Sequence, residues 1–169
     1  AFSRCKKIRV GTALGDDYFP AEWGDTVPDE AFYDRLDVVR VELPPRIKKI
    51  GDGAFANCSN LEECVVPPGV EVGSDAFFGC SKLRATTVLG GADFPAEWGD
   101  TVPDEAFKYR LDVVKVELPP RIKKIGEGAF YYCGNLEECV ILRGVEVGKN
   151  VFFGCKKYRA STVLGDADF

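Results

Sequence analysis

Apolar side chains recur along this chain at a fixed spacing. Val38, Val41 and Leu43 set the pattern, which returns 23 residues later, beginning at Leu61 and Cys64. The last two apolar positions of each set are separated by one residue, the spacing of a short strand with one buried face. A pair of prolines follows and ends the strand, because proline has no N–H for the ladder. We therefore expect short parallel strands that pair edge to edge from unit to unit.

The pattern belongs to an internal repeat of 75 residues. Residues 19–32 return letter for letter at 94–107, and residues 41–51 return at 116–126. Such a repeat predicts a solenoid of stacked coils with a thin, continuous core. The last unit stops partway, so we expect residues 1–169 to be one repeat domain and a window of a longer array. The finer units begin at Ala1, Ala31, Ala54, Ala76, Ala106, Ala129 and Val151.

The second residue of every unit is a phenylalanine, which predicts a ladder of rings in the core. The segment from Asp29 to Leu36 surrounds one of these residues and has an acidic start, which favours a short helix. Gly51 and Gly53 stand where the backbone must turn sharply. The expected ladder is one column of Phe2, Phe32, Phe55, Phe77, Phe107, Phe130 and Phe152.

Residues 50–70 (IGDGAFANCSNLEECVVPPGV) and 125–145 (IGEGAFYYCGNLEECVILRGV) agree in many columns. They resemble the unit of the BspA-like leucine-rich repeats, I-G-x-x-A-F-x-x-C-x-x-L followed by a strand and a proline. The resemblance implies an α/β leucine-rich-repeat solenoid, a right-handed coil with one parallel β-sheet and short helical or 3-10 turns on the return side. Arg35 and Arg110 replace the cysteine of that unit, and each third unit carries an insertion containing FPAEWGDTVPDE.

Cysteines occupy two columns of the repeat. Cys64 and Cys139 stand at inward strand positions, and the other column opens with Cys5. Small buried thiols pack as modest hydrophobes, so a reduced ladder is one prediction. Disulfides between adjacent coils are the alternative, since the coils lie within disulfide reach. Zinc is disfavoured because the chain has no histidine and no C-x-x-C. The first column comprises Cys5, Cys58, Cys80, Cys133 and Cys155.

The residues between the inward strand positions should form the face on which leucine-rich repeats usually hold partners. Opposite charges fall side by side there on neighbouring coils, as Arg40 does beside Glu63. Such pairs either satisfy one another across the strands or offer a polar docking face to a protein. The candidate binding residues are Arg9, Arg40, Glu62, Glu63, Arg84, Lys115, Glu137, Glu138 and Arg159.

The insertions hold a second set of candidates. Trp23 and Trp98 lie among glycine, proline and acidic residues, where a loop is expected. An exposed tryptophan would anchor a partner or another copy, with Asp25 and Asp100 beside it. The alternative is that each ring folds back over its own coil, because a large apolar ring is rarely left in water. Calcium is disfavoured because no D-x-D-x-D-G loop is present.

Composition excludes several classes of function. A net charge of −5 without a long basic tract argues against nucleic acid, whose phosphates need clustered Lys and Arg. No apolar run has the length of a membrane span. Without histidine or a recognisable nucleophile, phosphate or dinucleotide motif, we expect no catalytic residues, no metal and no cofactor.

The expected function is therefore that of a non-enzymatic scaffold. By the resemblance, it mediates protein–protein interaction or adhesion at the cell surface or outside the cell. The alternative is a structural subunit of an extracellular fibre or rod that assembles through the repeated Trp-containing insertions. The expected partners are a protein ligand or other copies of the chain.

Overall fold

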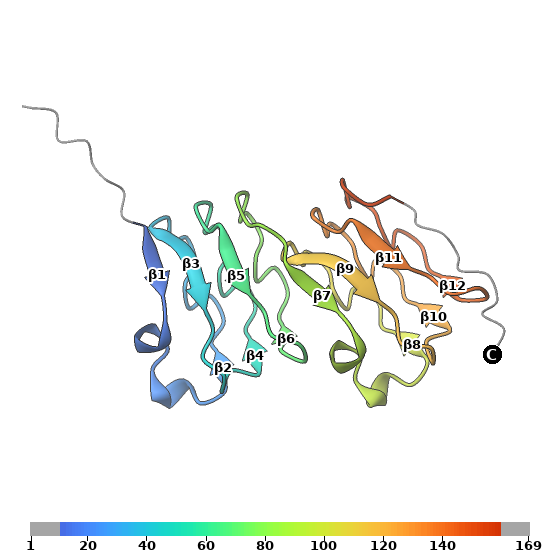
Figure 1. Ribbon diagram of the computed structural model, residues 1–169, viewed down its shortest axis with the longest axis horizontal. Helices are drawn as coiled ribbons and strands as arrows, with labels where there is room; N and C mark the ends of the chain where they lie inside the picture. Colours follow the sequence, from blue (N-terminus) through green and yellow to red (C-terminus); the bar gives the residue numbers. More distant parts are fainter. Residues whose placement is uncertain (1–10, 160–169) are drawn as a thin grey trace, which may run out of the picture.

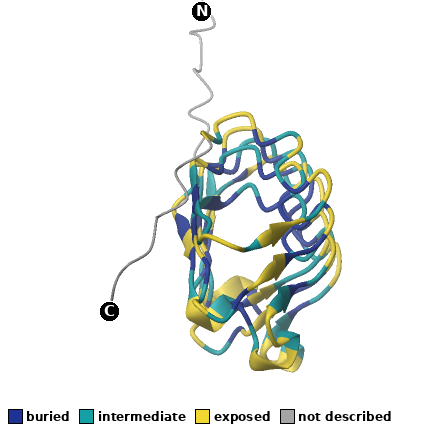
Figure 2. Cartoon of the chain, turned by 90° about the vertical axis from the view of Figure 1, so that its right-hand side faces the viewer, coloured by how far each residue is buried: buried dark blue, intermediate teal, exposed yellow. Residues whose placement is uncertain are grey.

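The computed structural model describes residues 11–159, which form a solenoid of successive coils (Figure 1). Seen along the stack, the buried positions face the space between the strands and the return segments (Figure 2). The longer strands are β1 (Thr12–Leu14), β3 (Val38–Glu42), β5 (Glu63–Val65), β7 (Thr87–Leu89), β9 (Val113–Glu117) and β11 (Glu138–Val140). The two-residue strands are β2 (Thr26–Val27), β4 (Lys49–Ile50), β6 (Glu71–Val72), β8 (Thr101–Val102), β10 (Lys124–Ile125) and β12 (Glu146–Val147).

The strands pair in parallel as predicted, but the expected single sheet is wrong. The described residues form four three-stranded sheets, β1-β3-β5, β7-β9-β11, β2-β4-β6 and β8-β10-β12. Equivalent residues of successive coils lie side by side, as Val41 and Cys64 do. Both columns of strands break at the border of the two 75-residue copies (Figure 1). We call residues 11–84 the first block and residues 85–159 the second block.

The return segments are turns, and the helix predicted from Asp29 to Leu36 is wrong. Alternate amides there bond sideways to the next coil: the N–H of Glu30 donates to Asp52 O and that of Phe32 to Ala54 O, each at 2.8 Å. Glu30 also has a left-handed φ of 53°, which no α-helix accommodates. The 3-10 helices lie in the insertions and not on the return side. They are η1 (Asp16–Tyr18), η2 (Ala21–Trp23), η3 (Gly91–Asp93) and η4 (Ala96–Trp98).

Glycine is required where one coil passes close to the next. A Cβ at Gly51 would lie 2.4 Å from the carboxylate of Asp29 and 2.6 Å from its backbone nitrogen. Gly126 meets Asp104 at 2.5 Å in the same way. Real Cβ atoms do not approach this closely, so the I-G step of the repeat is fixed by contact between coils.

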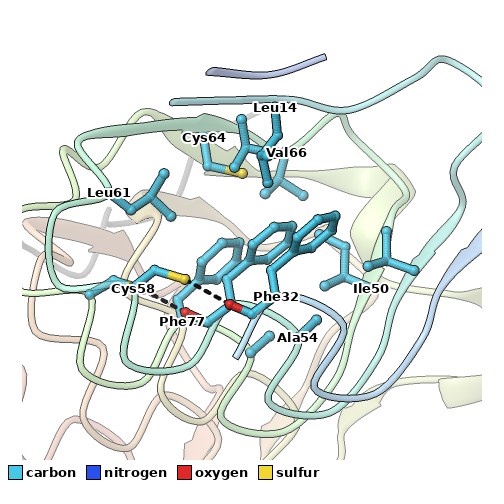
Figure 3. Close-up of a cluster of buried hydrophobic side chains, with 14 of the residues drawn as sticks. Leu14, Phe32, Ile50, Ala54, Cys58, Leu61, Cys64, Val66 and Phe77 are labelled. Atoms are coloured by element: carbon cyan, nitrogen blue, oxygen red, sulfur yellow. Dashed lines mark hydrogen bonds between the residues drawn. The ribbon is translucent and has the colours of Figure 1, made fainter. Parts of the chain in front are cut away.

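The phenylalanine ladder forms, but as two stacks and not as one column. In the first block Phe55 lies between Phe32 and Phe77, with centroids 5.2 and 5.7 Å away and ring planes within 6° of parallel. Phe32 and Phe77 are labelled in Figure 3, among the other buried side chains of this block. The second block repeats the arrangement with Phe107, Phe130 and Phe152, at 5.3 and 5.8 Å.

The insertion interrupts the ladder between Phe77 and Phe107. Phe94 packs edge-on against Phe107 with centroids 5.3 Å apart, and Trp98 packs against the same ring at 5.6 Å. Each third unit has 30 residues where the others have 22 or 23, and its apolar residues begin the next stack. The buried residues accordingly form two core clusters, one in each block.

The predicted column of buried cysteines is confirmed where the structure describes it. The thiol of Cys58 donates to the carbonyl oxygen of Phe32 at 3.1 Å (Figure 3). The thiol of Cys80 donates to the carbonyl oxygen of Phe55, also at 3.1 Å. All six cysteines within residues 11–159 are buried and reduced. Burial raises the pKa of Cys80 to about 12, so this thiol stays protonated at neutral pH. Cys5 lies outside the described residues. In the second block, the thiol of Cys133 donates to the carbonyl oxygen of Phe107 and that of Cys155 to the carbonyl oxygen of Phe130, each at 3.0 Å.

Arg110, which replaces a cysteine of the repeat unit, is buried together with a carboxylate. Its Nε and Nη2 each lie 2.8 Å from Asp112 oxygens, and the two side chains are 5% and 0% exposed. Burial opposes the charge of Arg110, but Asp112 outweighs burial and holds the pKa of Arg110 above its ordinary value. A salt bridge thus fills a core position that a thiol fills in other coils.

Candidate protein-binding surface

The outward side chains on the longer strands and just before them form a surface in each block that we call the strand face. In β3, Val38 and Val41 are buried, whereas Val39 and Arg40 between them point outward. Two outward residues in succession break the regular alternation of a strand, because the register with β1 shifts here and leaves Val39 as an extra residue, as in a β-bulge. Arg9, predicted for the same surface, lies outside the described residues. The strand face comprises Val39, Arg40, Glu62, Glu63 and Arg84 in the first block, and Val114, Lys115, Glu137, Glu138 and Arg159 in the second.

The predicted pairing of opposite charges between coils is confirmed on the first block. Arg40 Nε lies 3.7 Å from a carboxylate oxygen of Glu63, and Arg40 Nη2 lies 2.9 Å from Glu42 on its own strand. Arg84 Nη2 lies 3.6 Å from Glu62. Each cation therefore already has a carboxylate neighbour, and Arg40 has two.

The second block repeats this arrangement. Lys115 Nζ lies 3.2 Å from Glu117 and 3.6 Å from Glu138. The hydrogen bond to Glu117 and the charge of Glu138 raise the pKa of Lys115. Glu137 and Arg159 are neighbours through the backbone, where the N–H of Arg159 donates to Glu137 O at 3.3 Å.

Two hollows lie on the strand face. Both combine charged side chains of both signs, which suits a polar contact with another protein. The first, of about 430 Å³, is lined by Val39, Arg40, Glu62, Glu63, Arg84 and Thr86. The second, of about 710 Å³, is lined by Glu137, Glu138, Lys156, Lys157, Tyr158 and Arg159.

The tryptophans of the insertions fold back over their own coils. Trp23 packs edge-on against Phe19 and Phe32, with centroids 6.3 and 5.8 Å apart. Trp98 makes the equivalent contacts with Phe94 and Phe107 at 6.2 and 5.6 Å. Both indoles are half-buried against the core. The structure thus shows the folded-back arrangement, and a role for their exposed edges in binding or assembly stays a prediction.

The neighbouring acids help to fix the insertions on the solenoid. The carbonyl oxygen of Asp25 accepts from the N–H of Lys48 at 2.7 Å, and its carboxylate accepts from the hydroxyl of Thr26 at 3.1 Å. Arg46 Nη1 reaches back to the carboxylate of Asp16 at 3.0 Å. Asp25 therefore has a structural role whether or not it also meets a partner. In the second insertion, Asp100 makes the equivalent contacts: its carbonyl oxygen accepts from the N–H of Lys123 at 2.7 Å, and its carboxylate accepts from the hydroxyl of Thr101 at 3.0 Å.

Other kinds of site find little support in the described part of the chain. Within residues 11–159, histidine, cysteine and acidic side chains nowhere gather in a group of three that could hold a metal ion. No helix in the same residues has the length and apolar character needed to cross a membrane. The strand face and the insertions remain the sites to consider, together with one surface that the sequence did not predict.

That surface is a cluster of aromatic side chains on the return segments. Phe78, Tyr132 and Phe153 are 49%, 38% and 53% exposed, and the partly exposed Tyr109 and Tyr131 lie among them. We call these five residues the aromatic patch. The signal for it in the sequence is a difference between the copies, because Asp34, Ala56 and Asn57 stand where the second copy has Tyr109, Tyr131 and Tyr132.

Comparison with known proteins identifies the repeat. A family model described as the BspA type leucine-rich repeat region matches residues 25–159 in six copies. The solved leucine-rich repeat protein of T. pallidum is similar, with a TM-score of 0.53 and 27% identity, covering 80% of this chain and 72% of that one. A leucine-rich repeat protein from Bacteroides ovatus has a TM-score of 0.45 and 18% identity, covering 79% and 45%. A leucine-rich cell surface protein from Faecalibacterium prausnitzii has a TM-score of 0.36 and 16% identity, and the match covers 84% of this chain and 58% of that one. No curated protein matches the chain.

Proposed function

Because the chain belongs to the BspA-type leucine-rich repeat family, we propose that it is a non-enzymatic scaffold that binds a protein ligand on its strand face. We place it outside the cell or at the cell surface, where the resemblance to this family supports an adhesive or binding role. The observation that carries the proposal is the row of paired charges that crosses successive coils on an exposed surface.

The strand-face charges are free to serve binding because the fold does not depend on them. Arg40 and Glu63 are 50% and 45% exposed, and an exposed pair contributes only about 0.2–1 kcal/mol to stability. A ligand with complementary charges can replace the partner of either side chain at little cost. Such complementarity raises the association rate and sets the register of the complex.

The test is a variant that removes whole pairs from the strand face. Arg40→Ala, Glu63→Ala, Lys115→Ala and Glu138→Ala together leave the net charge unchanged. Glu42 and Glu117 lose their cations, but both carboxylates are well exposed, at 64% and 59%. We expect the variant to fold normally and to lose at least tenfold in affinity for any extracellular protein domain that binds the wild-type chain in an interferometry screen of an array of such domains.

A matched control removes the same number of pairs from the two-residue strands. Lys49 lies 3.0 Å from Glu71, and Lys124 lies 3.2 Å from Glu146. Changing these four residues to alanine should leave the affinity unchanged. Equal affinity for all three proteins would place the ligand elsewhere and contradict the proposal.

The second candidate function is a fibre or rod subunit that assembles through the insertions. Its support is that the two insertions present the same geometry 75 residues apart, with interplanar angles of 86° between Trp23 and Phe19 and 88° between Trp98 and Phe94. Light scattering over a wide concentration range should then show growing particles for the wild-type chain. Trp23→Ala with Trp98→Ala should abolish the growth, with circular dichroism to verify the fold. A monomer at all concentrations would exclude this candidate.

A further inference from the structure

The aromatic patch is one continuous surface because successive coils align it. The N–H of Tyr109 donates to Tyr131 O at 2.8 Å, and the N–H of Tyr132 donates to Phe153 O at 2.7 Å. The ring centroids of Tyr131 and Phe153 lie 5.3 Å apart, and those of Tyr109 and Tyr132 lie 5.6 Å apart. Phe78 of the first block reaches the ring of Tyr109 at 5.7 Å. The patch therefore spans four coils and crosses the border between the blocks.

Two of its tyrosines occupy a backbone conformation that disfavours them. Tyr109 and Tyr132 have φ of 58° and 54°, in the left-handed region that bulky residues rarely adopt. The first copy has Asp34 and Asn57 there, at 57° and 60°, and these residue types tolerate the region best. The left-handed backbone thus costs stability at both positions, and Tyr132 stays 38% exposed. Strain of this kind is characteristic of positions that serve function.

The second copy is also the more basic of the two. Residues 106–159 contain eleven Lys and Arg against six Asp and Glu, whereas residues 31–84 contain seven against eight. Lys108 stands beside the patch, with its Nζ 5.4 Å from the ring centroid of Tyr109 and 5.6 Å from that of Tyr131. Lys108 Nζ also lies 3.2 Å from Glu105 of the same chain, and a partly exposed pair of this kind can exchange its carboxylate for that of a partner at little cost. A partly exposed aromatic surface beside this lysine, in the more basic copy, fits a partner that is acidic and has apolar side chains of its own.

The chain itself carries such a partner surface. Residues 11–30 contain six Asp and Glu and no basic residue, and residues 86–105 contain five and none. Glu22 and Glu97 are among the exposed acids, next to the half-buried indoles, and the insertions bulge from the end of the coils where η1 to η4 lie (Figure 1). We propose that the aromatic patch is the surface on which a second copy of this chain docks, through its acidic insertion.

A contact between two different surfaces is heterologous, so it continues from one copy to the next. This inference rests on the second candidate function, self-assembly through the insertions, and names the surface that the insertion meets. The strand face and the aromatic patch share no residue, so a test of one leaves the other untouched.

The copies themselves supply the variant that tests the patch. Lys108→Tyr, Tyr109→Asp, Tyr131→Ala and Tyr132→Asn give the second copy the residues that the first copy folds with. We expect this reverted variant to remain folded with a higher Tm, because two strained tyrosines are removed. In sedimentation velocity at low salt, the wild-type chain should associate and the reverted variant should stay monomeric. High salt should weaken the association of the wild-type chain, because opposite charges steer the contact.

Two further variants separate the patch from the insertion. Glu22→Gln with Glu97→Gln should weaken the association and reduce its salt dependence. The reciprocal graft, Tyr33→Lys, Asp34→Tyr, Ala56→Tyr and Asn57→Tyr, should create a second patch and strengthen the association.

A wild-type chain that stays monomeric at every concentration would overturn both the patch inference and the candidate function on which it rests. Association that persists in the reverted variant but is lost with the insertion variant would overturn the patch alone and leave self-assembly through the insertions standing.

Discussion

The salt bridge between Arg35 and Asp37 and the one between Arg110 and Asp112 have the same local sequence, R-L-D, and different surroundings. Their Nε–Oδ1 distances are both 2.8 Å, yet the side chains are 40% and 48% exposed in the first pair and 5% and 0% exposed in the second. The pair geometry is therefore local, whereas burial comes from the neighbouring coil. The same R-L-D motif therefore forms an exposed salt bridge in one coil and a buried one in another, depending on the coil that packs on it.

The coil that covers the second pair belongs to the first block. The side-chain amide of Asn135 donates to Leu83 O at 3.2 Å and to Leu111 O at 2.8 Å, so it bridges the border. Leu111, between Arg110 and Asp112 in the sequence, packs against the core cluster of the first block. Since β5 and β7 do not pair within the described residues, the bond from Asn135 to Leu83 and this packing join the blocks at the border.

Where the surroundings of the two blocks match, equal substitutions should have equal effects, and the largest expected effect is of this kind. Phe55 and Phe130 are each fully buried between two parallel rings. Phe55→Ala and Phe130→Ala should each lower the free energy of unfolding by about 3–5 kcal/mol. Urea unfolding monitored by circular dichroism measures both. An unchanged free energy of unfolding after either substitution would contradict the stacked-ring core.

Where the surroundings differ, the same substitution should have unequal effects. Arg110→Ala leaves the carboxylate of Asp112 buried without its cation and should cost about 3–5 kcal/mol. Arg35→Ala removes an exposed pair and should cost about 0.2–1 kcal/mol. Replacing Arg110 with Met and Asp112 with Leu together should restore most of the lost stability, because no charge is then buried. Equal costs for the two arginines in urea unfolding would contradict the observed difference in burial.

The sequence predicted most of what repeats in every unit. The inward strand positions, the stacked phenylalanines, the cysteine column and the pairing of Arg40 with Glu63 all follow from registering the units on one another. Each of these features depends only on a coil and its immediate neighbours, and the neighbours are equivalent throughout the array.

The features that the sequence did not predict depend on what differs between units. The insertion resembled a polar loop, since it is rich in Gly, Pro and Asp. The folding back of Trp98 was one of two alternatives, but the burial of Phe94, which packs on Phe107 and divides the core, was not predicted. Arg110 was noted only as a departure from the repeat, although Asp112 two residues later supplies its partner. The helix expected after Asp29 does not form, because backbone amides that a helix would need donate instead to carbonyl oxygens of the next coil. Local propensity could not reveal this competition between coils.

Alkaline pH offers a milder test that the buried thiols of both blocks are alike. Burial raises the pKa of Cys80 and that of Cys139 to about 12, above the value of a thiol in the unfolded chain. Each buried thiol therefore makes its full contribution to the free energy of unfolding below about pH 9. This contribution falls as the pH rises toward 12, by about 1.4 kcal/mol per pH unit for each thiol. Cys80→Ala and Cys139→Ala should each flatten the fall between pH 9 and pH 10.5 in urea unfolding, relative to the wild-type chain. A slope equal to that of the wild type would show that the substituted thiol is not protected by burial.

The smallest expected effect concerns the exposed positions at which the copies diverge. Tyr132→Asn should raise the free energy of unfolding by about 1 kcal/mol, because asparagine tolerates the left-handed φ that strains tyrosine. Asn57→Tyr should lower it by at least as much, since it also removes the hydrogen bond of 3.1 Å from the Asn57 amide to the Tyr33 hydroxyl. The two changes exchange residues between equivalent coils, so urea unfolding of the pair isolates the strain from the packing. A loss of stability in Tyr132→Asn would mean that the ring supports the fold, and the second copy would then need no partner to account for its tyrosines. A gain would mean that these residues are retained at a cost to the fold, which a binding surface explains and a structural role does not.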